Sequence, residues 1–386
     1  MASATTASDA PVLRRVDKLT VTIVVDNSIE WMAKLPPGFS GESHRHLVDQ
    51  TPPVDPLTGV PILDFENWCC GAHGFSALIE TEVATADDTK SERHLTLFDT
   101  GPDSRTIARN ADALQLPLAS IDRVVLSHWH SDHTGGLLSL LSKRAHASDV
   151  TSNNTTTAQT GTRPIVVDAH PHRPTARGIA PGPAYDRVVG RLPEDPRFDA
   201  IERAGAQVET HAGAHAVAGG TVYVSGEIAR VTAFEAGLPG GMRWDDVGAV
   251  WVAEPDIMDE RYAAIDVAGK GLVIFSACSH AGIVNVLKDA VHKLARPIYA
   301  VIGGLHLVTP DLAPRIAPTV DFLSRQLVPA PAYVLPMHCT GFTARIALEA
   351  ALGEGCVPAG VGTKFVLEGD RDAEARVMEP VIRSSV

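Results

Sequence analysis

Residues 126–135 read Leu-Ser-His-Trp-His-Ser-Asp-His-Thr-Gly, and they constrain the fold more than any other segment of this chain of 386 residues. Within them stand four side chains of the kinds that bind metals: His128, His130, Asp132 and His133. Imidazole is the commonest ligand for zinc and related divalent ions, and carboxylate suits the harder ones. The apolar stretch Ile121–Leu126 predicts a buried strand before the cluster, and the leucine-rich stretch Leu137–Leu141 predicts a helix after it. A strand-to-helix loop is where an α/β fold usually places its chemistry.

The spacing within this cluster predicts two metal ions close together. His128 and His130 are two residues apart, so both can point the same way from an extended loop. Asp132 and His133 follow where the chain turns, and they can face a second ion. A surface loop that is merely rich in histidine is the alternative, but the flanking strand and the glycine turn argue against it.

The cluster resembles the His-x-His-x-Asp-His signature of the metallo-β-lactamase superfamily, and Leu97–Gly101 resembles that superfamily's strand ending in Asp-Thr-Gly. Further segments resemble one branch, which contains the dihydropterin-ribofuranosylaminobenzene-phosphate synthase of methanopterin synthesis. These segments are His73–Ser76, Gly226–Arg230, Cys278–Ile283, Gly303–Leu307 and His338–Gly341. The resemblance runs from about Leu19 to Leu367 in the same order. It implies an α/β fold, the αββα sandwich, in which two mixed sheets pack face to face with helices outside.

Apolar patterning agrees with that architecture, because strands and helices alternate in both halves of the chain. Strands are predicted at 19–25, 76–81, 94–99, 164–168, 272–276, 298–302 and 333–336, and helices at 103–110, 283–294, 313–327 and 343–352. We expect a single domain over residues 18–368, because ligands from His128 to His338 must converge. A disordered lead at 1–17, a flexible insertion at 147–162 and a tail at 369–386 are expected outside its core.

Two later histidines are expected to complete the metal site, because each follows a predicted buried strand. His280 comes after the strand 272–276, and His338 comes after the strand 333–336. His170 stands in a similar position after 165–169, as either a ligand or a contact for substrate, and His306 has the same two roles open. His73 is expected beside the metals or the substrate and not as a ligand.

The resemblance also exposes a departure from the superfamily. Most members end the strand before His280 in an Asp that bridges two metals, whereas this chain reads Ser276-Ala277-Cys278-Ser279-His280. Three alternatives are open: His280 takes over metal binding, Cys278 does so, or one site is weak. Asp99 is expected to orient the metal loop without binding metal, and Glu227 could act likewise.

The metals imply a mechanism. One or two divalent ions, zinc foremost with iron or manganese as alternatives, would generate hydroxide at neutral pH for attack on a small ester, lactone or phosphoester. Asp132 and His170 are the predicted catalytic residues. The main alternative is a synthase-like transferase acting on a phosphorylated small molecule. A basic cradle from Arg173, Arg177 or Arg230 would favour it. An iron-dependent redox protein is a third and weaker reading.

Composition restricts the partners. The net charge is −13 without a Lys/Arg run, which argues against nucleic acid, and no segment is apolar enough to suggest a membrane span. Five cysteines without a framework spacing suggest reduced thiols in the cytoplasm. The expected partner is therefore a small-molecule substrate, and a homo-oligomer is allowed.

Overall fold

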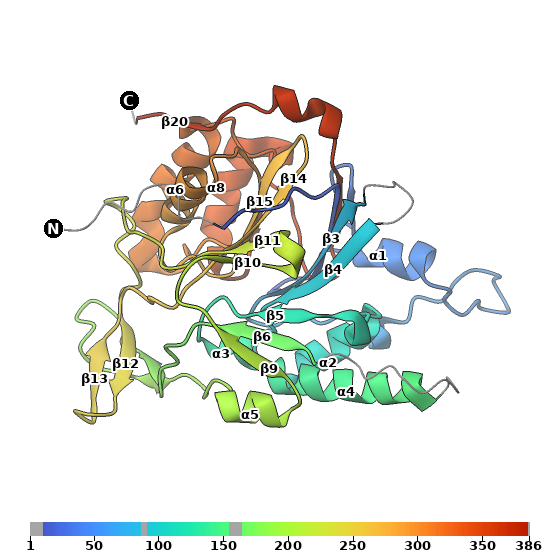
Figure 1. The fold of residues 1–386 in the computed structure, drawn as a ribbon, viewed down its shortest axis with the longest axis horizontal. Coiled ribbons are helices and arrows are strands. Elements are labelled where there is room, and N and C mark those ends of the chain that lie inside the picture. Colours follow the sequence, from blue (N-terminus) through green and yellow to red (C-terminus); the bar gives the residue numbers. More distant parts are fainter. Residues whose placement is uncertain (1–10, 86–90, 154–163, 385–386) are drawn as a thin grey trace.

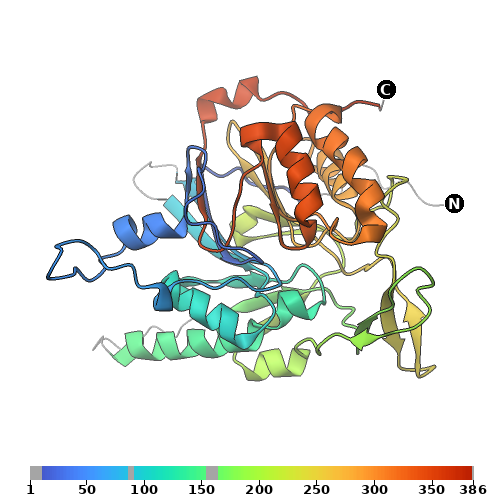
Figure 2. The same ribbon diagram turned by 180° about the vertical axis from the view of Figure 1, so that it is seen from behind.

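The apolar segments of both halves form two large sheets, which pack face to face with helices on their outer sides (Figures 1 and 2). A computed structural model describes residues 11–85, 91–153 and 164–384. The eight-stranded sheet has the order β2 (Phe39–Ser40), β19 (Lys364–Glu368), β1 (Lys18–Val25), β3 (Ser76–Ala84), β4 (Ser91–Phe98), β5 (Arg123–Val125), β6 (Val166–Ala169) and β9 (Gln207–Thr210). The six-stranded sheet has the order β10 (His215–Val217), β11 (Val222–Val224), β14 (Ala263–Val267), β15 (Gly271–Ser276), β16 (Ile298–Gly304) and β18 (Tyr333–Met337). The αββα prediction is confirmed.

Two small sheets lie outside this sandwich. One has the order β13 (Val250–Ala253), β12 (Gly241–Asp245), β7 (Arg177–Ile179) and β8 (Gly190–Arg191), and the other pairs β17 (Leu327–Val328) with β20 (Val381–Ile382). The α-helices are α1 (Glu42–His44), α2 (Ser104–Ala113), α3 (Ser131–Thr134), α4 (Leu137–Asn153), α5 (Phe198–Arg203), α6 (Ile283–Leu294), α7 (Ile316–Asp321) and α8 (Phe342–Leu352). Short 3₁₀ or π turns complete the order: η1 (Arg45–Asp49), η2 (Phe65–Asn67), η3 (Leu118–Ser120), η4 (Ala218–Gly220), η5 (Pro310–Arg315), η6 (Phe322–Gln326), η7 (His338–Thr340), η8 (Gly353–Gly355) and η9 (Arg371–Arg376).

Three apolar layers hold the sandwich together. Val21, Phe98 and Phe275 belong to the layer between the sheets. Ile107 of α2 and other side chains pack on the outer face of the eight-stranded sheet, and Leu287 of α6 does the same on the six-stranded sheet. Each such side chain contributes about 1.5–3 kcal/mol when fully buried. Sheet faces and helix stripes of this kind are what the alternating sequence pattern predicted.

The directions of the strands determine which edge of each sheet carries the site loops. Strands β4, β5, β6 and β9 run parallel, as do β15, β16 and β18. The loops that follow parallel strands therefore gather at one edge of each sheet, which is where open α/β sheets bind ligands.

The expected disordered lead is wrong for residues 11–17. Val16 is fully buried and forms a β-bridge with Val267, and the backbone N–H of Arg14 donates to the Gly220 carbonyl. The segment is ordered because both its backbone and its apolar side chain are used by the second sheet. Residues 1–10 lie outside the described part of the chain.

The expected tail at 369–386 is likewise part of the fold over its described residues. Glu374 of η9 pairs with Arg296, and Arg371 pairs with Asp17. Strand β20 then adds to β17. Charged contacts, which apolar patterning does not detect, hold this segment.

The expected insertion at 147–162 is in part the end of a helix, because α4 continues to Asn153. Residues 154–163 lie outside the described part of the chain. Among the described residues, no helix combines the length and the apolar character needed to cross a bilayer.

Candidate metal centre

Loops from both sheets bring six of the predicted site residues together at one edge of the sandwich. The loop after β5 and the helix α3 carry His128, His130, Asp132 and His133, all four close to the end of the first sheet. His280 follows β15, and His338 begins η7 directly after β18. Except for Asp132, these residues are almost fully buried.

A first group consists of three imidazoles whose ring nitrogens face one another. The Nε2 atom of His128 lies 3.0 Å from Nδ1 of His130, and Nε2 of His280 lies 3.2 Å from each of those two atoms. Three unprotonated nitrogens at this separation repel each other unless a cation lies between them, so the arrangement suits a metal ion.

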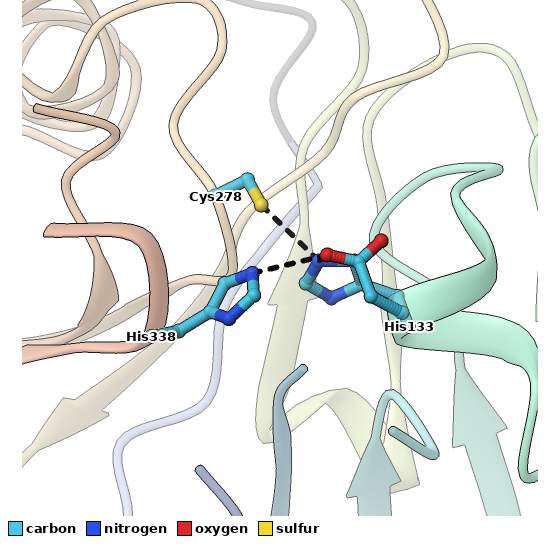
Figure 3. A group of neighbouring side chains, drawn as sticks. His133, Cys278 and His338 are labelled. Carbon is cyan, nitrogen blue, oxygen red and sulfur yellow. Dashed lines mark hydrogen bonds and ion pairs between the residues drawn. The ribbon is translucent and has the colours of Figure 1, made fainter. Parts of the chain in front are cut away.

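A second group lies beside the first and is drawn in Figure 3. The Nε2 atom of His338 lies 3.2 Å from an Asp132 carboxylate oxygen, and Nε2 of His133 lies 3.5 Å from the same oxygen. The Cys278 thiol lies 3.1 Å from Nε2 of His133. Apart from this contact with Asp132, the buried Nε2 of His338 has no hydrogen-bond partner among the described residues, which is what a metal ligand shows before its ion is added.

Cys278 belongs to both groups. Its sulfur lies within 4.8 Å of the ligand atoms of Asp132, His133 and His338, and also of those of His128 and His280. It therefore lies between the two groups, in the sequence segment where the resemblance led us to expect a bridging Asp. His280 lies in the first group and Cys278 lies between the groups, and the metal-binding role of each stays a prediction.

Polar partners fix the orientation of the ligands. Asp99 accepts hydrogen bonds from the Ser127 backbone and hydroxyl and lies 2.8 Å from Nδ1 of His133. The Ser127 hydroxyl in turn lies 2.8 Å from Nδ1 of His128. Each Nδ1 is thereby assigned a proton, which leaves Nε2 free for a metal. The predicted orienting role of Asp99 agrees with these contacts.

Sequence reasoning missed two further partners. Asn27, just past β1, places its amide oxygen 3.2 Å from Nδ1 of His338. Glu260 accepts the backbone N–H groups of His280 and Ala281, both at 2.7 Å. Glu227, which the sequence offered for such a role, is exposed. Asn27 and Glu260 were missed because each lies in a connecting segment whose local sequence pattern does not single it out.

Burial sets the protonation states. Burial and the neighbouring imidazoles lower the pKa of His128 and of His280, and burial with the nearby Arg177 lowers the pKa of His130 to about 3. Neutral imidazole is the form that binds metals. Burial raises the pKa of the Cys278 thiol, so a cation at the site is needed to make it a thiolate. The donor set therefore fits divalent metal ions.

Four residues at this edge have strained backbone conformations. Asp99, Ser279, His306 and His338 all have positive φ, between 45° and 61°. Such conformations are costly for residues other than glycine and persist where surrounding structure enforces them, often at functional sites.

The structure does not bring His170 into the cluster. Its Nδ1 accepts the His172 backbone N–H, and its carbonyl accepts the Trp129 indole N–H. The catalytic role of His170 stays a prediction. His73 lies at the rim, 3.8 Å from Asp132, and the His306 ring lies 4.4 Å from that of His280. Neither ring nitrogen of His306 has a hydrogen-bond partner in the described part of the chain.

The three arginines that the sequence offered for a basic cradle are held by other groups of the protein. Arg177 is buried in ion pairs with Asp259 and Glu254. Arg173 pairs with Glu194, and the Arg230 guanidinium donates to backbone carbonyls. No basic cradle that would favour a phosphorylated substrate forms from these three residues.

Comparison with known proteins identifies the class of this fold and site. Residues 89–232 match the family model described as the metallo-beta-lactamase superfamily. The chain is 31% identical over 276 residues to 7,8-dihydropterin-6-methyl-4-(beta-D-ribofuranosyl)-aminobenzene-5'-phosphate synthase of Methanocaldococcus jannaschii, covering 70% of this chain and 82% of that protein. The chain therefore belongs to the metallo-β-lactamase superfamily.

Two further proteins are similar to this chain. An uncharacterised protein of the same archaeon is 26% identical over 280 residues, covering 70% of this chain and 85% of that protein. The crystal structure of Tm1679, described as a metal-dependent hydrolase of the beta-lactamase superfamily, has a TM-score of 0.60 and 18% identity. That match covers 91% of this chain and 99% of that one, and it supports the fold alone.

Proposed function

We propose that this protein is a metal-dependent hydrolase of a small ester, lactone or phosphoester, with two divalent ions held by His128, His130 and His280 and by Asp132, His133 and His338. The observation that carries the proposal is the meeting of the two ligand groups at Cys278. Imidazole and thiolate ligands favour zinc, with iron or manganese as alternatives. Ions bound in such a site lower the pKa of water to about 7 and polarise acyl or phosphoryl oxygens.

We propose that Asp132 orients the attacking water and relays its proton without retaining it. Its side chain is 23% exposed, which makes it the most accessible of the clustered ligands, and the neighbouring imidazoles outweigh burial and hold its pKa well below the usual range. The imidazole of His73, which is 67% exposed, lies 3.8 Å away and can pass the proton to solvent. His170 is proposed to contact substrate from the β6 side. The proposed partner is a small molecule.

A second candidate function, a synthase acting on a phosphorylated small molecule, is favoured by the 31% identity to the archaeal synthase. We place this synthase second because Arg173, Arg177 and Arg230 already contact other protein groups. A phosphate contact would have to come from other groups.

The proposal is tested by measuring two quantities: the metal content, and the hydrolysis of panels of esters, lactones and phosphoesters. Both are measured on wild type, Cys278→Ala and Cys278→Asp. We expect the central cluster to hold about two ions per chain in wild type and in Cys278→Asp, because a carboxylate can replace a thiolate as a zinc ligand. Cys278→Ala is expected to lose metal and activity, and Cys356→Ser, a half-buried thiol outside the cluster, serves as the control. Wild type that holds both ions and hydrolyses none of the panels would contradict the hydrolase proposal.

A further inference from the structure

We propose that Asp168, His211 and His215 form a second, separate site for a divalent transition metal such as Zn²⁺. The site lies where the two large sheets are joined by the chain. His211 directly follows β9, the edge strand of the eight-stranded sheet, and His215 begins β10, the edge strand of the six-stranded sheet. Asp168 of β6 pairs in register with Glu209 of β9. The site shares no residue with the centre described above.

The ligand atoms are already close. The Nε2 atom of His215 lies 2.8 Å from Oδ2 of Asp168, and Nε2 of His211 lies 4.0 Å from the same oxygen. The two imidazole rings stack with centroids 3.9 Å apart. All three ligand atoms lie within 4.8 Å of one another. Bonds of about 2.0 Å in a tetrahedral zinc site place ligand atoms roughly 3.3 Å apart, so small side-chain rotations suffice.

The contacts of the two His215 ring nitrogens require a proton or a cation between Nε2 and Asp168. Its Nδ1 lies 3.2 Å from the Gly213 carbonyl, which can only accept a hydrogen bond, so Nδ1 carries a proton. Nε2 then faces the Asp168 carboxylate at 2.8 Å. Either a second proton or a metal ion must lie between those two atoms. Burial and the neighbouring His215 lower the pKa of His211, which favours the neutral imidazole that a metal requires.

The neighbouring guanidinium groups determine which Asp168 oxygen an ion could take. Arg261 holds Oδ1 of Asp168 at 2.8 Å, whereas Arg123 lies 3.1 Å from Oδ2 and 2.8 Å from Glu209. The two carboxylates thus balance the two guanidinium groups. We infer that an ion takes Oδ2 while Arg123 stays on Glu209. Zinc is held by three neutral imidazoles in known sites, so a further negative charge is not required.

The proposed site is open to solvent, and an ion there would link the two sheets. The His211 side chain is 38% exposed, so an ion can enter and a water can supply a fourth ligand. Arg261 also donates to the carbonyl of Leu126, which precedes the metal loop. An ion bound here would tie β9 to β10 and hold the two sheets together at this edge.

The test counts zinc in the fully loaded protein. Four proteins are dialysed against the same buffered free Zn²⁺, and their zinc is measured by mass spectrometry. They are wild type, the site variants His211→Ala and His215→Ala, and the control His292→Ala, which changes an exposed histidine of α6. We expect wild type and His292→Ala to bind about one ion more per chain than the two site variants. Because His211 is partly exposed, its removal leaves the core intact.

Equal zinc in wild type and in both site variants would overturn the proposal and leave His215 as an imidazolium paired with Asp168. Loss of the extra ion in His292→Ala as well would also overturn it. The central cluster keeps all its residues in every variant, so a failure here is distinguishable from a failure of the proposed function.

Discussion

At the scale of single residues, the metal centre depends on side chains that never touch the ion. The carboxylate of Asp99 contacts both Ser127 and His133, and the Ser127 hydroxyl contacts His128. One buried carboxylate therefore sets the tautomer of a ligand in each of the two groups.

Asp99→Asn tests this coupling. Asparagine tolerates the positive φ of this position, but its amide cannot accept from all the groups that the carboxylate serves. We expect metal affinity to fall about 10–100-fold, the usual cost of losing such a partner. The control is Asp103→Asn, since Asp103 caps α2 by accepting from Arg105 and Thr106, and asparagine caps equally well. Competition with a chromogenic chelator measures both variants, and unchanged affinity in Asp99→Asn would contradict the prediction.

At the scale of elements, the metal loop is fixed by close backbone packing. The short helix α3 is followed directly by Gly135, where a Cβ atom would lie 2.0 Å from the Pro102 carbonyl oxygen. The loop that carries Asp99 and the loop that carries the ligands are thus pressed together. This contact explains why Gly135 stands directly after the ligand cluster.

Gly135→Ala should therefore separate the two loops. We expect the free energy of unfolding to fall by about 1–3 kcal/mol, typical of overpacking, and metal affinity to fall with it. Gly190→Ala is the matched control, because a Cβ there meets nothing within 4 Å. Urea unfolding gives the first quantity and chelator competition the second. A Gly135→Ala variant as stable as Gly190→Ala would show that the loop can move aside.

The elements also show what the sequence could predict. The strand ending at Ser276 and the helix Ile283–Leu294 were recognised because their apolar patterns are local. His280 and His338 were found because each follows such a strand. The placement of Cys278 between two ligand groups could not be read locally, because it arises only when both sheets converge. Glu260 was missed for the same reason, since it precedes His280 by twenty residues and meets its backbone only in the folded chain.

At the scale of the whole molecule, the metal centre joins the two halves of the sandwich. The eight-stranded sheet contributes four ligands from its end: His128, His130, Asp132 and His133. The six-stranded sheet contributes Cys278, His280 and His338. The layer between the sheets is apolar, so at this edge a bound ion would add a direct link between side chains of both halves. Bound metal should then contribute to the stability of the whole chain and not only to one loop.

Metal removal measures that contribution. A ligand that binds only the folded state at a free concentration about 1,000 times its Kd stabilises by about 4 kcal/mol. For a chain of this length we expect a chelator to lower Tm by about 5 °C. The shift should be much smaller in a His128→Ala/His133→Ala double variant, which keeps only the separate site at His211 and His215, and it should persist in His211→Ala, which retains the central ligands. A chelator shift of the same size in the double variant would mean that the stabilising ion lies elsewhere, because that protein has lost an imidazole from each ligand group.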